Sequence, residues 1–209
     1  MPILPMFPLG SVLLPSVFLP LHIFEPRYRQ LAHDCLAGER EFGVVLIERG
    51  SEVGGGDTRG SVGTVARILE AVELPDGRWA VGAVGTRRVR VRQWLDDDPY
   101  PRADVEDWDD PDPSPGTDAL AAGVVATLRQ VLALRSELGD LVADATHELS
   151  DDPVLISYQA TALSPFGPAD QQSLLEAASA EDRLTQLAAL LAEEQVVLDQ
   201  RLHIDDDHS

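Results

Sequence analysis

The chain contains no lysine, and all sixteen of its basic residues are arginine. A phosphate-binding loop of the Walker type is excluded, because its lysine must reach the β- and γ-phosphates of a nucleotide. Schiff-base catalysis and a serine–lysine dyad are excluded for the same reason, since both depend on a lysine amine. The sequence therefore predicts a chain without these catalytic systems.

Cysteine is nearly absent, and so are targeting patterns. Cys35 stands alone and cannot form a disulfide within the chain, which is typical of a reducing compartment. Residues 1–5 lack the basic region that opens a signal peptide. Prolines interrupt the apolar stretch Leu9–Phe24, so we expect no run of the ~18–20 apolar residues that span a bilayer. These absences predict a cytoplasmic protein with no membrane partner.

Basic charge is scarce beside acidic charge. The 209 residues include 36 Asp and Glu against 16 Arg, and the formal net charge is −20. The hydrophobic content of 44% is ordinary for a folded globular protein. A surface this acidic repels the phosphates of nucleic acids and favours neutral or basic protein partners. We expect polypeptide or protein partners and no nucleic acid.

Strand patterns dominate the first half of the chain. The β-branched runs Phe42–Ile47 and Val62–Ile68 predict strands, and Leu74–Arg78 has the Pro-Asp-Gly composition of a hairpin turn. Residues Arg88–Arg92 alternate arginine with valine, which places the two kinds of side chain on opposite faces of a strand. One helix is predicted among the strands, at Pro26–Ala37, from apolar residues at helical spacing.

An acidic, proline-rich stretch then leads into patterns with the period of a helix. We expect residues 96–118 to hold one edge strand, at about 103–107, followed by a semi-extended linker. Helices are predicted from Thr117 to the terminating Gly139, from Pro153 to Leu163, and after Ser179, where Asp182 gives a capping-box spacing.

These patterns together predict an α+β fold. We expect a β-rich domain with one internal helix and the acidic linker over residues 1–115, followed by an α-helical domain, a small bundle, over residues 116–209.

Few residues point to catalysis. Cys35 lies on the apolar side of the predicted helix, where a buried hydrophobic role is expected instead of a reactive thiolate. A hydrolase that uses His22 or His147 is an alternative function, although no serine occupies a G-x-S-x-G elbow. We therefore identify no catalytic residue.

Candidate metal and phosphate sites fail on their spacing. The tail His203–His208 has ligand-type side chains but reads as a frayed acidic terminus. Asp110–Ser114 resembles half of a calcium loop, yet Pro115 stands where glycine is needed. The glycines 54–56 precede a predicted strand, so we expect a flexible loop without the helix N-terminus that a phosphate site needs. No metal or cofactor is expected.

The arginines of residues 88–92 are the one basic feature, and they suggest RNA binding as a further alternative. Asp104 and Glu106 alternate in the same way on the predicted neighbouring strand. Opposite charges on adjacent strands stabilise a sheet by about 0.2–1 kcal/mol per pair, so we interpret these arginines as structural and rank RNA binding last.

A set of short motifs follows in one order along the chain: Leu4–Leu9, Leu13–Pro15, Leu19–Arg29, Phe42–Val45, Val62–Ile68, Pro75–Arg78, Val84–Val91, Asp170–Glu176 and Arg183–Leu184. In this order the motifs resemble the N-terminal domain of the ATP-dependent protease Lon. They extend over almost the whole chain, with one departure: Val89 stands where the family has an aromatic residue.

The resemblance implies a β-rich, PUA-like pseudo-barrel followed by a helical bundle, and the role of a Lon substrate-recognition domain. The ATPase and Ser–Lys protease modules of Lon would begin where this chain ends. We therefore expect a stand-alone, non-catalytic module that binds polypeptides. One role for such a module is as an adaptor for a separate ATP-dependent protease. A peptidase label would come from the family name only.

The peptide-binding site is expected to be an apolar groove or patch with polar edges. Aromatic anchors are favoured in such interfaces, so we select Trp94, Tyr100 and Trp108 as candidates. The alternative for these three side chains is packing at an edge strand or between the domains.

Overall fold

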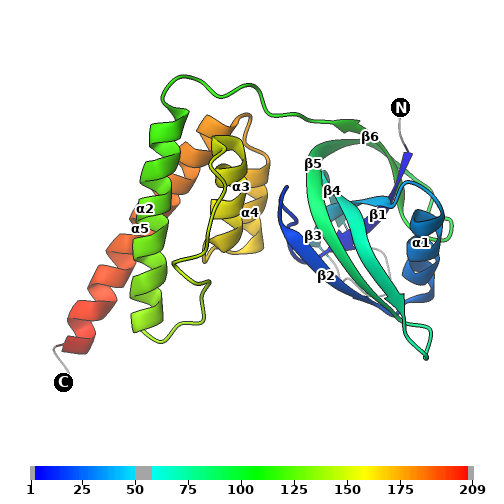
Figure 1. The fold of residues 1–209 in the computed structure, drawn as a ribbon, viewed down its shortest axis with the longest axis horizontal. Coiled ribbons are helices and arrows are strands. Elements are labelled where there is room, and N and C mark those ends of the chain that lie inside the picture. Colours follow the sequence, from blue (N-terminus) through cyan, green and yellow to red (C-terminus); the bar gives the residue numbers. More distant parts are fainter. Residues whose placement is uncertain (1–2, 50–57, 207–209) are drawn as a thin grey trace. The chain divides into compact units, whose positions relative to one another are not determined.

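The computed structural model describes residues 3–49 and 58–206, with side chains up to Leu202. Two compact units are formed, Met1–Asp109 and Asp110–Ser209. Among the described residues, the first unit contains six strands and one helix and the second contains four helices (Figure 1). The α+β class is confirmed. The assignment of domains to residues 1–115 and 116–209 stays a prediction, and the glycines 54–56 lie outside the described residues.

The first unit is built on one mixed sheet. Its elements are β1 (Ile3–Leu9), β2 (Phe18–Ile23), α1 (Pro26–Ala37), β3 (Glu41–Arg49), β4 (Thr58–Glu73), β5 (Trp79–Leu95) and β6 (Arg102–Asp107). The strand order is β2-β5-β4-β3-β1-β6, and β5 also pairs with β6. The strands β1, β3, β4, β5 and β6 therefore close on themselves as a small barrel, and β2 lies outside this ring.

Strand β5 is long enough to belong to the closed barrel and also to pair with β2. Its first residues, 79–84, pair with β2, while residues 89–95 pair with β6. The prediction of an edge strand at 103–107 is wrong, because β6 pairs with β5 on one side and with β1 on the other. A local pattern gives no sign of this closure, because the β1–β6 pairs join residues about a hundred positions apart in the chain.

The predicted hairpin turn joins β4 to β5. The amide of Leu74 donates to the carbonyl of Arg78 at 2.7 Å, and Glu73 pairs with Trp79. Gly77 has φ 77°, the left-handed conformation that glycine adopts without steric cost. The predicted helix is α1, and its apolar side packs into the barrel core. There the Tyr28 ring stacks on Phe7, with 4.2 Å between centroids.

Four strands carry a ladder of charges at the barrel surface. Arg87 on β5 reaches Asp107 on β6 and Glu41 on β3, each at 2.9 Å. Glu41 also accepts from Arg67 on β4 at 2.8 Å. Cross-strand pairs of opposite charge support the pairing of the strands. Arg67 and Arg87 are therefore both engaged by carboxylates.

The second unit contains α2 (Thr117–Glu137), α3 (Pro153–Leu163), α4 (Pro168–Leu175) and α5 (Ala180–Asp206). The Asp182 amide donates to Ser179 Oγ at 3.1 Å, which confirms the capping interaction predicted for α5. Gly139, with φ 83°, follows the end of α2 as predicted. Helix α4 was not predicted, because it begins at the last proline of a Pro-Phe-Gly-Pro segment and its eight residues are too few to show a clear period.

The expectation that no stretch is long and apolar enough to span a bilayer is also corrected. Among the described residues helix α2 is long and apolar enough, by length and composition alone, to cross a membrane. The one candidate considered from the sequence was Leu9–Phe24, which prolines interrupt, and α2 was not considered. The average composition of α2 is apolar although it contains charged residues such as Arg129. Core helices meet the same criterion. Helix α2 buries Val124, Leu128 and Leu132 in the core of the second unit.

A fully buried arginine joins the start of the second unit to its helices. Arg183 on α5 donates to Asp110 at 3.0 Å, to Ser157 on α3 at 2.7 Å and to the carbonyl of Leu174 at 2.9 Å. Its guanidinium also lies 3.8 Å from the centre of the Tyr158 ring. A buried charge is stable only when it is paired and hydrogen-bonded, and here the available partners come from α3, α4 and the chain before α2.

We predict that Arg183→Leu lowers the free energy of unfolding by about 3 kcal/mol or more, because it leaves the Asp110 carboxylate without its buried partner. Urea unfolding followed by circular dichroism would measure the loss. Arg129→Leu, which removes an exposed arginine from α2, serves as the matched control and is expected to change stability by less than about 0.5 kcal/mol. Equal effects of the two variants would contradict this account of Arg183.

Candidate functional site

An exposed apolar surface lies where β2, β5 and β4 run beyond the closed barrel. In the pairing register, Phe18 stands opposite Val84 and His22 opposite Ala80, and Ala80 in turn stands opposite Val72. Residues paired across antiparallel strands share a face. Phe18 and Val72 are 54% and 58% exposed, so this face points outward.

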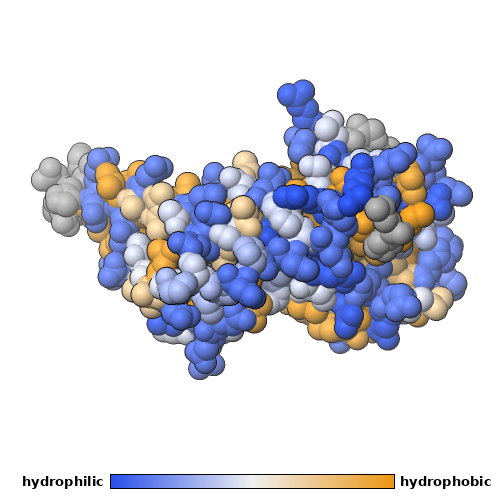
Figure 2. Space-filling view, turned by 90° about the horizontal axis from the view of Figure 1, so that it is seen from above, coloured by the Kyte–Doolittle hydropathy of each residue, from blue (hydrophilic) through white to orange (hydrophobic). Residues whose placement is uncertain are grey.

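A bulge adds one more apolar residue to this surface. The register shifts between Ile68 and Glu70, which leaves Leu69 as the additional residue. Ile68 is buried, whereas Leu69 is 56% exposed. We call the outward side chains of Phe18, Leu69, Val72, Ala80 and Val84 the apolar face. The side of the molecule seen in Figure 2 is mostly hydrophilic, with apolar atoms in separate clusters.

Gly82 shapes the middle of the apolar face. A Cβ atom at this position would lie 3.0 Å from Phe18 Cζ and 3.0 Å from Glu70 Cγ. The Phe18 ring and the Glu70 side chain therefore lean together over the glycine. A larger residue here would push both away, so the shape of the face depends on this close approach.

A carboxylate stands beside the apolar face. Glu70 is exposed on β4 opposite Gly82, and among the residues that the structure describes it has no ion-pair partner. The nearby Arg67 is engaged by Glu41. The border of the apolar face therefore carries an acidic side chain, and the expected polar-edged peptide site stays a prediction.

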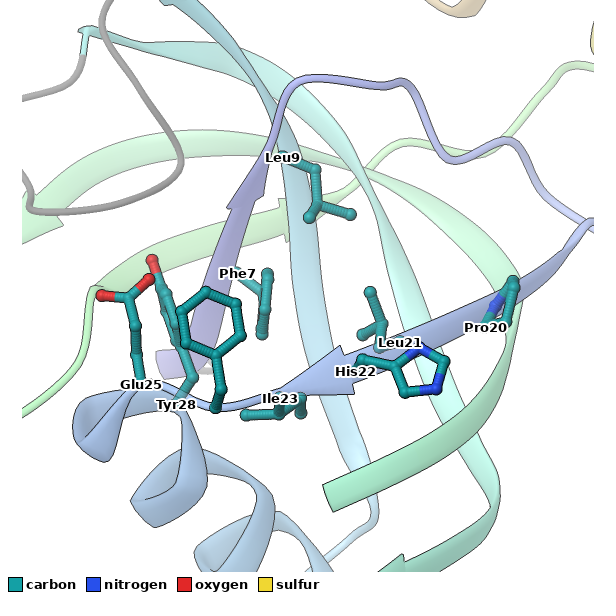
Figure 3. Close-up of a pocket in the computed structure, with 9 residues that line it drawn as sticks. Phe7, Leu9, Pro20, Leu21, His22, Ile23, Glu25 and Tyr28 are labelled. Atoms are coloured by element: carbon teal, nitrogen blue, oxygen red, sulfur yellow. The ribbon is translucent and has the colours of Figure 1, made fainter. Parts of the chain in front are cut away.

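A pocket of about 190 Å³ opens beside β2, between β2 and β1. We call it the seam pocket. Its lining residues are Phe7, Leu9, Pro20, Leu21, His22, Ile23, Phe24, Glu25 and Tyr28. Leu9 and Leu21 point toward each other across the gap between the two strands (Figure 3). Because Pro20 and His22 line the pocket and also face outward on β2, the pocket mouth adjoins the apolar face.

The aromatic residues selected from the sequence have three different surroundings. Tyr100 is buried, Trp94 and Trp108 are half-buried, and none of them lines the seam pocket. The Arg59 guanidinium lies 4.9 Å from the centre of the Trp94 ring, and that of Arg90 lies 3.5 Å from the centre of the Trp108 ring. The role of these aromatics in peptide binding stays a prediction.

Tyr100 has a clear structural role. Its ring belongs to the barrel core, and its hydroxyl donates to Asp34 at 2.9 Å. Burial, and then the hydrogen bond to the Asp34 carboxylate, raise the pKa of Tyr100 to about 12. The residue therefore stays neutral and connects the segment before β6 to α1.

The arginines of β5 do not form an open basic face. Arg88 is buried, with its guanidinium 4.2 Å from the centre of the Trp108 ring, whereas Val89 is buried on the other face as predicted. Arg92 forms an ion pair with Glu106. Arg88 is buried against Trp108, Arg90 lies over the same ring, and Arg92 is paired with a β6 carboxylate, although Arg90 and Arg92 are exposed. The interpretation of these arginines as structural stays a prediction.

The histidines proposed for a hydrolase are far apart in the chain and lie in different units. His22 is exposed on β2 and lines the seam pocket, and His147 is exposed in the segment between α2 and α3. Neither ring has a hydrogen bond to another described residue. Within the described part of the chain, no three His, Cys, Asp or Glu side chains meet as a metal site would require. The side chains of the tail 203–208 lie outside it.

The first unit is a closed barrel whose outlying sheet presents an acidic-edged apolar face beside an apolar pocket, and the second is a helical bundle. This architecture defines the class as an α+β protein with a β-barrel unit and a helical unit. The family model of the ATP-dependent protease La (LON) substrate-binding domain matches residues 3–193. The chain belongs to this family, and the matched model is that of the substrate-binding part alone.

Curated relatives of the chain are Lon proteases. It is 30% identical over 207 residues to Lon protease 2 of Herpetosiphon aurantiacus, covering 98% of this chain and 25% of the relative. It is 28% identical to the Lon protease of Roseiflexus castenholzii, covering 94% of this chain and 25% of that protein. The chain thus spans about a quarter of the length of these relatives.

Two solved structures share the fold. The Lon N-terminal domain protein from Xanthomonas campestris superposes with a TM-score of 0.65 at 30% identity, covering 90% of this chain and 98% of that one. The N-terminal domain of the Mycobacterium avium complex Lon protease superposes with a TM-score of 0.67 at 19% identity, covering 91% and 98%. The second likeness concerns the fold alone.

We predict that the Cys35 thiol of the folded protein does not react with a thiol reagent. The residue is buried in the barrel core, and this burial, with a contribution from Asp34, raises its pKa to about 12. Labelling at about pH 8, where an ordinary thiol is partly ionised, should be slow in native protein and rapid in urea. Fast stoichiometric labelling of the native protein would show a reactive cysteine instead.

Proposed function

We propose that this chain is a non-catalytic module that recognises polypeptides, and that the apolar face is its main contact surface. The observation that carries the proposal is the gathering of Phe18, Leu69 and Val72, each more than half exposed, on one face of the first unit. Exposed contiguous apolar surface is characteristic of interaction sites. Membership of a substrate-binding family supports a polypeptide as the ligand.

The charge of the chain supports the same ligand class. A formal net charge of −20 favours segments that combine apolar with neutral or basic residues. The Glu70 carboxylate beside the apolar face, which has no ion-pair partner among the described residues, favours them too. Nucleic acids and anionic membranes would be repelled by this surface. A cytoplasmic location is part of the proposal, since a single buried cysteine suits a reducing compartment.

The further part of the proposal is an adaptor role. The module would capture polypeptides and present them to a separate ATP-dependent protease, and it would contribute no hydrolysis itself. The support is the family match, which concerns the substrate-binding domain alone, together with the absence of lysine for a Ser–Lys site. Trp94, Tyr100 and Trp108 stay proposed as secondary contacts, with Tyr100 acting through its position in the core.

We predict that the double variant Leu69→Ser, Val72→Ser weakens binding of a disordered polypeptide by about tenfold or more, because two apolar side chains no longer become buried. Fluorescence anisotropy of labelled β-casein would measure the affinity. The matched control is Val196→Ser, Val197→Ser, which removes equally exposed apolar side chains from α5. Binding that is unchanged by the first variant, or lowered equally by both, would exclude the apolar face as the site.

The adaptor role predicts a second effect. Purified chain added to a Lon-type protease with ATP should change the rate at which the protease degrades the disordered polypeptide. The Leu69→Ser, Val72→Ser variant should leave the rate at its value without adaptor. Peptide cleavage by the chain alone would contradict the non-catalytic assignment, and an unaltered protease rate would contradict the adaptor role while leaving polypeptide binding intact.

A further inference from the structure

The seam pocket exists because two strands do not pair. Among the described residues β2 pairs with β5 alone, and β1 pairs with β3 and β6. No backbone ladder therefore draws β1 and β2 together. The gap between them is lined by side chains of both strands and by the start of α1 (Figure 3).

The dimensions of the pocket suit one large apolar side chain. Its volume is about 190 Å³, and Phe7, Leu9, Leu21 and Ile23 contribute much of its wall. A cavity of about 150 Å³ lined by leucine, isoleucine and phenylalanine is large enough to bind benzene. A leucine or phenylalanine side chain therefore fits, whereas alanine would leave most of the apolar wall uncovered.

The edge of β2 favours insertion of a side chain over addition of a strand. The Val17 carbonyl accepts from Gly85, so by the alternation of an antiparallel strand the backbone of Phe18, Pro20 and His22 faces away from β5. Pro20 has no N–H, which removes a donor from the middle of this edge. Contact through side chains is thus the stronger means of binding here.

The charges near the pocket mouth indicate the neighbours of the inserted side chain. Glu25 lines the pocket and is held by Arg27 at 3.1 Å. The nearby apolar face adds the carboxylate of Glu70, which has no ion-pair partner among the described residues. A segment with basic residues beside its apolar residue complements this surface, and one with acidic residues there is repelled.

We propose that the seam pocket is an anchor site that takes one leucine- or phenylalanine-sized side chain of a bound polypeptide, with arginine or lysine beside it. The proposal rests on the proposed function, and it adds a preference for particular segments. The apolar face would then contact the residues that flank the anchor, since the pocket mouth adjoins it along β2.

The test uses short labelled peptides of threonine and alanine, each with one central residue flanked by arginines, and measures their affinity by fluorescence anisotropy. Central phenylalanine and leucine should bind about ten- to a hundredfold more tightly than central alanine, which is the effect of burying one large apolar side chain. Replacing the flanking arginines by glutamates should weaken binding, and added salt should reduce that difference.

Two further measurements locate the anchor. Phe24 lines the pocket and is 55% exposed, so the Phe24→Ala variant should still fold. The variant should lower the affinity for the phenylalanine peptide several-fold more than the affinity for the alanine peptide. The matched control, Ile3→Ala, removes a residue that is 58% exposed and does not line the pocket, and it should change neither affinity. Photo-leucine at the central position should cross-link to residues 7–9 or 21–28.

The outcomes separate this proposal from the function on which it rests. Equal affinity for central phenylalanine and alanine, or cross-links on Leu69 and Val72 without any at the pocket, would overturn the anchor site and leave polypeptide binding at the apolar face. If neither the peptides nor disordered β-casein bind, both proposals fail. Tight binding of the phenylalanine peptide that Phe24→Ala leaves unchanged would place the anchor elsewhere.

Discussion

The backbone hydrogen bonding of β5 is the constraint on which the candidate site depends. Strand β5 pairs with β4 along most of its length, with β6 over its second half and with β2 over its first half. The backbone N–H and C=O groups of a buried strand must form hydrogen bonds. Because different parts of β5 bond to different neighbours, the barrel closes at one end of β5 and an open sheet extends at the other. The apolar face and the seam pocket both lie on that open part.

Each feature of the site follows from this arrangement. Within the described residues of the first unit, no further element packs on the outer face of β2, β5 and β4 where they extend beyond the barrel, so Phe18, Leu69 and Val72 stay exposed. The absence of pairing between β1 and β2 leaves a gap that side chains only partly fill. Acidic residues beside these apolar surfaces keep them hydrated and set the charge of a partner that could cover them. An apolar surface can thus remain available for binding in a protein that is otherwise strongly charged.

The second unit depends on a buried charge instead of on strand pairing. Arg183 is surrounded by acceptors from α3, from the end of α4 and from Asp110, and Tyr158 covers its guanidinium. Removing the charge from water is costly, so these groups must stay in place together. Asp110 thereby serves as a structural anchor at the start of this unit, although its sequence surroundings resemble half of a calcium loop.

Local features of the sequence determined much of the local structure. The spacing of Tyr28, Leu31 and Cys35 placed one side of α1 in the core, the Pro-Asp-Gly turn joined β4 to β5, and Ser179 began α5. These features depend on neighbours a few residues away, and for that reason they can be read from sequence. The order of its motifs also indicated the family. Helix α4, in contrast, was too short for its period to be recognised.

Tertiary structure decided the closure of the barrel and the composition of the candidate site. The pairing of β6 with β1 joins the two ends of the first unit, and the apolar face combines residues from β2, β4 and β5 that are as much as 66 positions apart, from Phe18 to Val84. Trp94, Tyr100 and Trp108 were selected because aromatic residues favour interfaces, but burial and covering arginines set their surroundings. Exposure is a property of which strands pair, and that pairing is set by contacts between residues distant in the chain, which no local pattern records.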